Sequence, residues 1–327
     1  MADQWIASKV NLKPSTRALY DSILETHVRP RWATTQLARV THEDIQVWVS
    51  ALLAAGTGAA HVRKIVGTVL RGILALAVRS KRLPANPCDG IQLPRISHTA
   101  KRYLTAARVA ALADAAAELP ARRPRRGTDA SFAQYRLATL TLAYCGLRWS
   151  ELAALRTSRV DLLRRRILVA EAVVEVDGKQ LVWGSPKNHE VRSIPVPRFL
   201  ADELATHLMH KAPTDLVFTS PTGGVLRNRN ARKAWFDRAA VAIGELGLTP
   251  HELRHTAASL AVSAGANVKA VQRILGHASA TLTLDTYADL SDSDLDAVAD
   301  RLDAAFRANS EPATASIRHL PPAGDLG

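Results

Sequence analysis

The sequence predicts a mainly α-helical protein with a small antiparallel β-sheet, divided into two domains. Helical apolar periodicity dominates the first hundred residues and most of the chain after residue 197, whereas alternating apolar residues are confined to residues 166–196. A length of 327 residues suits two hydrophobic cores better than one. Prolines and glycines gather between residues 83 and 102, which indicates a linker. We therefore expect a helical domain at residues 1–90, a linker at 91–102 and a second domain at 103–290.

The first domain is expected to consist of helices. Thr41 is followed by the acidic residues Glu43 and Asp44, which is the pattern of an N-cap and a first helical turn. That helix is expected to end near Gly56, and a second, longer helix is expected from about residue 59 to residue 82. One face of this longer helix is basic, and it is either simply solvated or in contact with phosphates; its residues are Arg63, Lys64, Arg71, Arg79, Lys81 and Arg82.

In the second domain, Thr105 is expected to cap a helix that runs to about Leu119, and a basic loop follows at residues 122–126. The Asp177-Gly178 pair stands between two runs of β-branched and apolar residues, which predicts a hairpin with a tight turn. Further helices are expected at residues 197–211, 228–243, 250–264 and 267–275. Beyond them, an acidic segment with apolar residues at helical spacing predicts an amphipathic helix at 291–309, and a flexible tail is expected at 310–327.

The composition favours an intracellular protein that binds a polyanion. The chain has 43 Lys and Arg against 30 Asp and Glu, a net charge of +13. Nucleic acid is the first candidate partner, although RNA or an acidic protein would fit the charge as well. Cys88 and Cys145 are too few for a disulfide framework or a cysteine-based zinc site. Since the sequence has neither a membrane-spanning apolar run nor a signal peptide, a cytoplasmic location is expected.

Four short segments carry the candidate chemistry. They are Tyr-Cys-Gly-Leu-Arg-Trp-Ser-Glu-Leu at residues 144–152, Pro186-Lys187, His-Glu-Leu-Arg-His at residues 251–255, and Leu-Gly-His at residues 275–277 with Tyr287 ten residues further on. In this order and over this span they resemble the catalytic domain of the tyrosine recombinase (phage integrase) family. The preceding helical segment resembles that family's SAM-like core-binding domain. The resemblance covers roughly residues 5–305 and implies a helical core-binding domain followed by an α+β catalytic domain.

The segment at residues 251–255 also satisfies the His-Glu-x-x-His pattern of zinc proteases. In that interpretation His251 and His255 bind the metal and Glu252 is the general base. In the recombinase interpretation His251 and Arg254 share a helix face and meet a phosphate, while Glu252 forms a capping box with Thr249. The second interpretation explains more residues. A zinc protease, a type IB topoisomerase and a non-catalytic helical DNA-binding regulator are the alternatives.

The chemistry of phosphate displacement explains why arginines are found here. Arg148 and Arg254 are suited to stabilise the charge on the nonbridging oxygens, because guanidinium is planar, permanently charged and bidentate. Glu151 lies one helical turn after Arg148 and is expected to orient it. The resemblance implies the remaining roles: Lys187 as general acid, His251 as candidate base, His277 as a hydrogen-bond donor to the scissile phosphate, and Tyr287 as nucleophile.

The resemblance also implies the reaction and its partners. Tyr287 would form a 3′-phosphotyrosyl link with double-stranded DNA at a recombination site, and two rounds of exchange would pass through a Holliday junction. The assembly would be a homotetramer on two sites, with no cofactor or metal and with accessory DNA-bending or directionality proteins. In the family a C-terminal helix docks into a neighbouring protomer, and residues 291–309 are expected either to do the same or to pack on their own domain. Members that bind distant arm sites carry an extra N-terminal domain. About forty residues precede the helix expected at Thr41, so that domain is absent either from the natural protein or only from this sequence.

Overall fold

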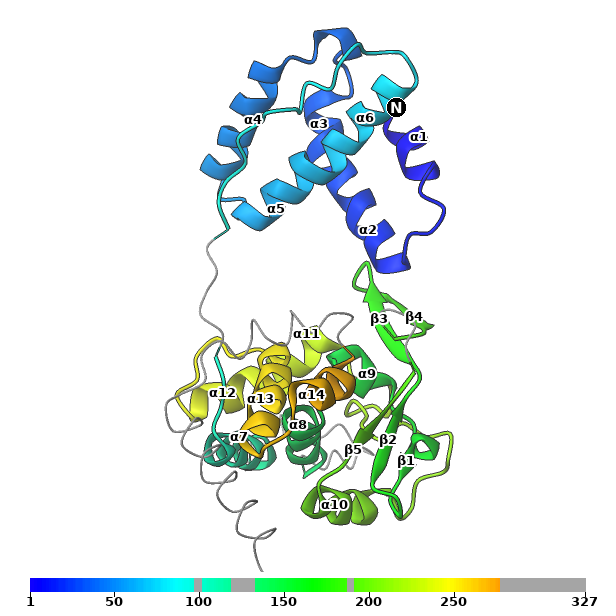
Figure 1. Ribbon diagram of the computed structural model, residues 1–327, viewed down its shortest axis with the longest axis vertical. Helices are drawn as coiled ribbons and strands as arrows, with labels where there is room; N and C mark the ends of the chain where they lie inside the picture. The colour runs from blue at the N-terminus through cyan, green and yellow to red at the C-terminus, as the bar shows by residue number, and fades with distance from the viewer. Residues whose placement is uncertain (97–101, 119–132, 187–190, 277–327) are drawn as a thin grey trace, which may run out of the picture.

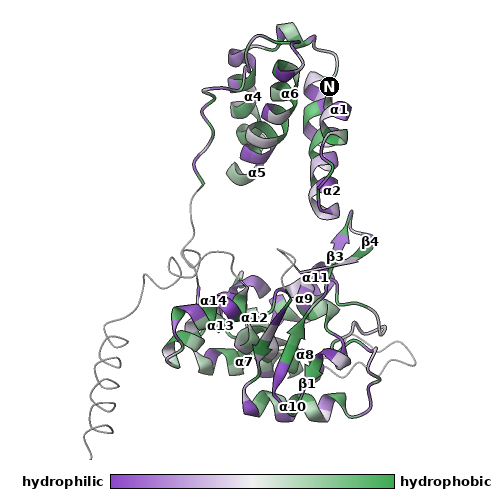
Figure 2. Ribbon diagram, turned by 45° about the vertical axis from the view of Figure 1, so that its right-hand side comes forward, coloured by the Kyte–Doolittle hydropathy of each residue, from purple (hydrophilic) through white to green (hydrophobic). Residues whose placement is uncertain are grey.

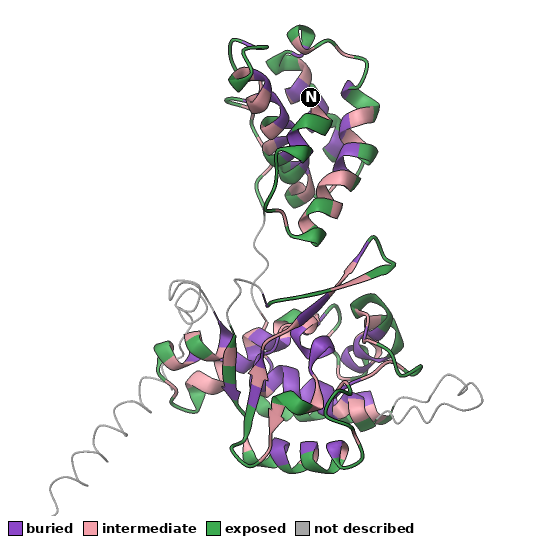
Figure 3. Ribbon diagram, turned by 90° about the vertical axis from the view of Figure 1, so that its right-hand side faces the viewer, coloured by how far each residue is buried: buried purple, intermediate pink, exposed green. Residues whose placement is uncertain are grey.

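The computed structural model describes residues 1–96, 102–118, 133–186 and 191–276. Within these residues the chain forms a helical domain and a larger mixed domain (Figure 1). Each domain has its own apolar core, the first built around Trp5 and Ile45 and the second around Tyr135 and Phe218. Buried residues accordingly form two separate groups in Figure 3. No helix among the described residues is long and apolar enough to cross a membrane.

The helical domain contains six α-helices linked by short π-helical and 3₁₀ segments within the described residues. These are α1 (Ala2–Ala7), α2 (Pro14–Ile23), a π segment (Leu24–Val28), α3 (Arg29–Trp32), a 3₁₀ turn (Leu37–Arg39), α4 (His42–Ala54), α5 (Ala59–Lys64), a π segment (Ile65–Leu70) and α6 (Arg71–Arg79). The predicted start of α4 is confirmed, because the Thr41 hydroxyl accepts the Asp44 backbone N–H at 3.1 Å. After α4 the chain turns at Gly56, whose φ is +82°.

The observed helix differs in two respects from the long helix predicted from residue 59 to residue 82. Its middle turn is π-helical, and it ends at Arg79 rather than Arg82. Lys81 adopts a left-handed φ of +56°, and the Arg82 N–H bonds back to the Ala77 carbonyl at 2.9 Å. These contacts make a Schellman-type end, which usually has glycine in the left-handed position. The sequence prediction missed this end because a lysine occupies that position.

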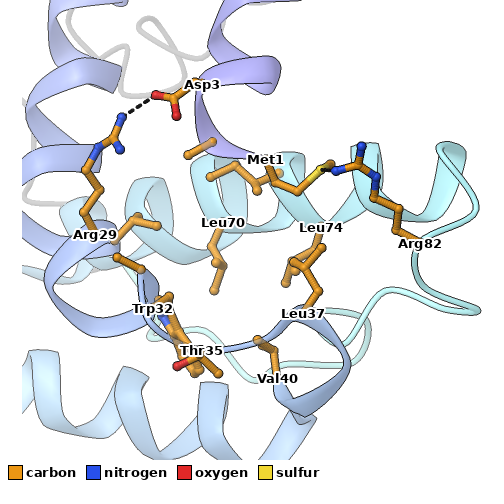
Figure 4. Close-up of a pocket in the computed structure, with 14 residues that line it drawn as sticks. Met1, Asp3, Arg29, Trp32, Thr35, Leu37, Val40, Leu70, Leu74 and Arg82 are labelled. Carbon is orange, nitrogen blue, oxygen red and sulfur yellow. Dashed lines mark hydrogen bonds and ion pairs between the residues drawn. The ribbon is translucent and has the colours of Figure 1, made fainter.

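A pocket of about 410 Å³ lies in the helical domain between α1, α3 and α6, next to the chain start (Figure 4). Its walls are mainly apolar and include Trp32 and Leu74. At its rim the Asp3 carboxylate forms an ion pair with the Arg29 guanidinium at 2.5 Å. The Arg82 guanidinium lies 3.0 Å from the sulfur of Met1. Arg82 therefore lines the pocket beside Met1.

The second domain is built on helices that surround α8. Its helices are α7 (Ala106–Glu118), α8 (Ala133–Cys145), α9 (Trp149–Ala154), α10 (Arg198–Leu208), α11 (Asn228–Ala231), a π segment (Arg232–Phe236), α12 (Asp237–Ala242), α13 (Pro250–Ser263) and α14 (Val268–Leu275). The helix α8 is buried on nearly all sides, and α7 and α13 pack against it. Tyr135 of α8 stacks on Trp235 with ring centroids 5.0 Å apart. Surface helices such as α4 and α10 instead carry both hydrophilic and hydrophobic residues (Figure 2).

The predicted single sheet is two sheets. One has the strand order β1 (Val160–Asp161), β2 (Arg166–Val169) and β5 (Arg192–Pro195), all antiparallel. The other is the hairpin of β3 (Ala172–Val176) and β4 (Gln180–Gly184). The hairpin leaves the first sheet because β2 pairs with β5 rather than with β3, its neighbour in the sequence.

The predicted hairpin turn is confirmed. Asp177 and Gly178 both have positive φ, +54° and +66°, as a tight two-residue turn requires. Arg227 fastens the turn, because its guanidinium contacts the Glu175 carboxylate at 2.5 Å and the Lys179 carbonyl at 2.9 Å. In Figures 1, 2 and 3 the hairpin projects from the second domain toward α2, which contacts β3.

The two cysteines are core residues, as predicted. Cys88 and Cys145 are both buried and unpaired with each other. Burial raises the pKa of each thiol to about 12. Neither thiol therefore has the depressed pKa of a reactive cysteine.

Candidate active site

The N-terminus of α9 places a buried carboxylate beside two arginines. Glu151 follows the N-cap residue Arg148 by three positions, and its Oε2 accepts the Arg148 backbone N–H at 2.9 Å. The Arg148 guanidinium donates to Oε1 at 2.8 Å. Strand β5 contributes Arg192, which donates to Oε1 at 3.0 Å and to Oε2 at 2.6 Å. The Glu151 side chain is 0% exposed, so it needs these partners to stay ionised.

The protonation state of Glu151 follows from two opposed effects. Burial acts to raise the pKa of the carboxyl group, whereas the hydrogen bonds and charges of Arg192, and then of Arg148, lower it. The net result is a pKa below the ordinary value. Glu151 therefore remains a carboxylate at neutral pH and holds both arginines in place.

A third arginine reaches the same place from α13. The helix begins with the capping box predicted for Thr249 and Glu252, with Pro250 at its first position. One turn later Arg254 points inward, only 3% exposed, and donates to the Gly146 carbonyl at 2.6 Å and to the Leu275 carbonyl. Burial and then repulsion from Arg148 lower the pKa of Arg254 to about 9, against the opposing effect of Glu151. Among the described residues, Arg254 thus has more positive than negative charge around it.

The end of α14 supplies part of that missing charge. Arg192 donates to the Ile274 carbonyl at 2.9 Å, Arg254 donates to Leu275, and Arg148 lies 3.4 Å from the carbonyl oxygen of Gly276. Three successive carbonyls at a helix C-terminus therefore each face one arginine. These carbonyls have no partner within their helix and lie at its negative end, so cations are stabilised there. We call Arg148, Arg192 and Arg254 with Glu151 the arginine cluster.

The arginine cluster can bind an anion. Three guanidinium groups against one carboxylate leave two positive charges, which suits a phosphate. Within the described residues, Arg148 and Arg254 each use two of the five N–H donors of a guanidinium group. Arg148 has the more open side chain, 19% exposed, against 8% for Arg192. In the view of Figure 1, α9, α13 and α14 lie on the side of their domain that faces the helical domain.

The structure brings together three of the predicted site residues: Arg148, Glu151 and Arg254. His251 is exposed on the first turn of α13, with its ring 5.0 Å from that of His255 and nearly perpendicular to it. Lys187, His277 and Tyr287 lie outside the described residues.

Glu252 is engaged in structural contacts. Its carboxylate accepts the Thr249 backbone N–H at 2.7 Å and the Thr249 hydroxyl at 2.9 Å, and Arg102 donates to it at 3.1 Å. Burial acts to raise the pKa of Glu252, but these contacts lower it below its ordinary value. The residue therefore does the capping work that the recombinase interpretation assigned to it. Among the described residues, no cluster of three or more His, Cys, Asp or Glu side chains is arranged to hold a metal.

The basic face predicted for the first domain is exposed throughout but spread along the helices. Arg63 and Lys64 are the last residues of α5, a helix that lies on the side of the helical domain toward the second domain (Figure 1). Arg79 is the last residue of α6, and Lys81 and Arg82 follow that helix. Arg71 is paired with Asp89 at 2.7 Å. The six residues are therefore spread over α5, α6 and the turn after α6, because the helix ends before Lys81 and Arg82.

Arg192 is the member of the arginine cluster that sequence reasoning missed. A signal for it exists in the strand pattern. Side chains two apart share one face of a strand, so Arg192 shares a face with Ile194 and Val196, which are both buried. An arginine in register with core residues needs a buried partner. That partner is 41 positions earlier in the sequence, so pattern reasoning alone does not identify it as Glu151.

Comparison with known proteins identifies the family to which this fold belongs. Residues 102–294 match the profile of the phage integrase family, and residues 1–53 match the N-terminal SAM-like domain of phage integrases. The chain therefore belongs to the phage integrase family of tyrosine recombinases. This membership favours the recombinase interpretation of residues 251–255 over the zinc-protease one.

Relatives and solved structures extend the match over most of the chain. The prophage phiRv2 integrase of Mycobacterium tuberculosis is 30% identical over 86% of this chain and 72% of its own length. The integrase of Mycobacterium phage L5 is 27% identical over 84% of this chain and 70% of its own length. The Tn1549 transposon integrase, solved with transposon right end DNA, has a TM-score of 0.75 and 21% identity over 92% of this chain and 98% of that one. A lambda integrase tetramer bound to a Holliday junction has a TM-score of 0.66 and 20% identity over 86% of this chain and 77% of that one.

Proposed function

We propose that this chain is a site-specific recombinase that integrates and excises a phage or other mobile element. It would cleave and rejoin double-stranded DNA in the bacterial cytoplasm through a 3′-phosphotyrosyl link to Tyr287. The observation that carries the proposal is the arginine cluster. Its two excess positive charges lie around a fully buried carboxylate, between the family's motif segments at residues 144–152 and 251–255.

Arg148 and Arg254 stabilise the transition state at phosphorus in this proposal. The nonbridging oxygens gain charge as the nucleophile approaches, and cations already held in place stabilise that charge without reorganising. Glu151 holds Arg148, and the carbonyls of Gly146 and Leu275 hold Arg254. A scissile phosphate would supply the negative charge that Arg254, with its lowered pKa, lacks.

Proton transfers complete the reaction. Tyr287 oxygen forms a bond to phosphorus while the bond from phosphorus to the 5′ oxygen breaks. A tyrosine hydroxyl has a pKa near 10, so its proton must pass to a base, for which His251 is the candidate. The 5′ oxygen leaves as a hydroxyl after taking a proton from Lys187, and His277 donates a hydrogen bond to the phosphate. The 5′ hydroxyl of a partner duplex then attacks the phosphotyrosine and reverses each transfer.

We further propose the assembly and the division of the chain. Residues 1–90 and 103–290 would close around DNA as a clamp with the linker at 91–102 as hinge, and Arg63 and Lys64 are best placed to contact phosphates. Two rounds of strand exchange, with a Holliday junction between them, require four protomers on two sites. The relatives solved with DNA include a lambda integrase dimer on a core site and a tetramer on a Holliday junction. The acidic helix predicted at 291–309 would link neighbouring protomers.

Trapping the covalent intermediate tests this proposal. The substrate is a pool of duplexes with randomised sequence, each nicked near the centre. Cleavage of such a duplex releases a short fragment that carries the 5′ hydroxyl, so the strand cannot be rejoined. The chain should become linked to a subset of these duplexes in a complex that survives denaturation in detergent, and the linked DNA identifies the target site. EDTA should leave the yield unchanged. The absence of any covalent complex would contradict the proposed function.

A further inference from the structure

Arg192 is too buried to meet DNA, yet it makes the most extensive contacts in the arginine cluster. Its side chain is 8% exposed, and all three guanidinium nitrogens are bonded: Nε to the Ile274 carbonyl, and the two terminal nitrogens to the two oxygens of Glu151. The stem of Arg192 also lies against Gly276. A Cβ on Gly276 would come within 3.0 Å of Arg192 Cδ, and Gly276 has a left-handed φ of +62°. The end of α14 is therefore shaped around this side chain.

The contacts of Arg192 determine how much of Arg148 is left for other partners. Arg192 contacts both oxygens of Glu151, whereas the Arg148 guanidinium contacts only one of them. Among the described residues, the other terminal nitrogen of Arg148 makes a long contact, 3.4 Å to the carbonyl oxygen of Gly276. Without Arg192, the buried Glu151 carboxylate would have Arg148 as its remaining guanidinium partner, and a bidentate pair is the stable geometry for such a partner. Arg148 would then be drawn inward and neutralised.

We propose that Arg192 is a positioning residue for DNA cleavage: it occupies Glu151 so that Arg148 stays available to the scissile phosphate, and it fixes the end of α14. The inference rests on the proposed function, because it assigns Arg148 to the phosphate. It extends that function to a residue outside the family motifs identified in the sequence.

The charge of the scissile phosphate provides the test. In a methylphosphonate, a methyl group replaces one nonbridging oxygen and removes the negative charge, so a neutralising arginine matters less. Arg192→Met should cleave the nicked phosphodiester duplex about 10- to 100-fold more slowly than wild type, the loss expected for one misplaced cationic donor. On the same duplex with a methylphosphonate at the scissile position, its rate should lie within about threefold of wild type. Arg192→Lys keeps the charge but loses the fork geometry, so its cleavage rate on the phosphodiester duplex should lie between the rates of wild type and Arg192→Met.

Controls separate a positioning role from a merely structural one. Arg166→Met removes an exposed arginine from the neighbouring strand β2 and should behave as wild type on both duplexes. In the absence of DNA, hydrogen exchange at the end of α14 should be faster in Arg192→Met than in Arg166→Met. Equal losses on both duplexes for Arg192→Met and Arg192→Lys, or phosphodiester rates within threefold of wild type, would overturn the inference. If wild type itself forms no adduct, the proposed function fails instead.

Discussion

Arg254 donates a 2.6 Å hydrogen bond to the carbonyl oxygen of Gly146, a residue 108 positions earlier in the chain. This bond joins α13 to the loop that immediately precedes Arg148. Gly146 has a φ of +63°, and a Cβ there would lie 2.7 Å from Leu275 Cδ2 and 3.3 Å from the Ala257 Cβ. The close approach of α9, α13 and α14 therefore depends on a glycine at this position.

Gly146→Ala should destabilise the protein by about 1–3 kcal/mol, because the added methyl group meets α14 and the backbone conformation is strained. Urea unfolding measures this loss. Gly178→Ala is the matched control, because its φ is also positive but open space surrounds it. Equal losses for the two variants would mean that only backbone strain matters at Gly146. A larger loss of stability for Gly146→Ala would show that the packing of α14 against Gly146 also matters.

Arg148→Ala and Arg254→Ala should each slow adduct formation by about 100-fold or more, since one preorganised donor to the transition state is worth roughly 3–4 kcal/mol. Binding to the selected duplex should change far less, because many other phosphate contacts remain. Gel-shift affinities and single-turnover rates measure the two effects. The exposed Arg166→Ala is the control. Rates within a few-fold of wild type would mean that these arginines serve only the fold.

Glu151→Gln should lower the free energy of unfolding by about 3 kcal/mol at pH 7, because it leaves buried arginines without their counter-charge. The pKa of Glu151 is lowered in the folded state, so its contribution is fully present above the unfolded value, near 4.3. That contribution is lost as the pH falls through the lower folded pKa. The difference between wild type and Glu151→Gln should therefore shrink in urea titrations from pH 7 toward roughly pH 3.5. A difference that is independent of pH would exclude an ionised Glu151.

Lys187→Ala should lose cleavage of an ordinary duplex and recover it on a duplex whose bridging 5′ oxygen is replaced by sulfur. A thiolate leaves without being protonated, so the general acid is no longer required. Single-turnover rates on the two duplexes measure the recovery. Lys179→Ala, at the exposed hairpin turn, should cleave both duplexes as wild type does. Failure of the sulfur substrate to restore Lys187→Ala would move the acid role to another residue.

Much of the fold was predictable because it depends on local physics. The Thr41 cap, the Thr249 capping box and the Asp177-Gly178 turn are each decided by neighbouring residues, and the structure confirms all three. Helix α8 was not predicted, because it is buried on nearly all sides and so lacks the apolar periodicity of a surface helix. The division into two sheets was also missed, since it depends on which strand β2 selects as its partner.

In the candidate site, too, the predictable residues are those that depend on local sequence. Arg148, Glu151 and Arg254 stand in short motifs whose spacing places them on helix starts, and the structure brings them together. Arg192 belongs to the same arginine cluster through contacts to residues 41 and 82 positions away. Only the pairing of β5 with β2 and the docking of α14 create those contacts. Local sequence therefore identified Arg148, Glu151 and Arg254 but not Arg192.

The identity of the residue linked to DNA decides whether Tyr287 is the nucleophile. Mass spectrometry of the trapped wild-type complex, after nuclease and protease digestion, should place the nucleotide on Tyr287. Tyr287→Phe should form no complex while still binding the duplex, and Tyr144→Phe, a tyrosine packed against Phe199, should form as much as wild type. A covalent complex from Tyr287→Phe, or a nucleotide on any other residue, would contradict the account.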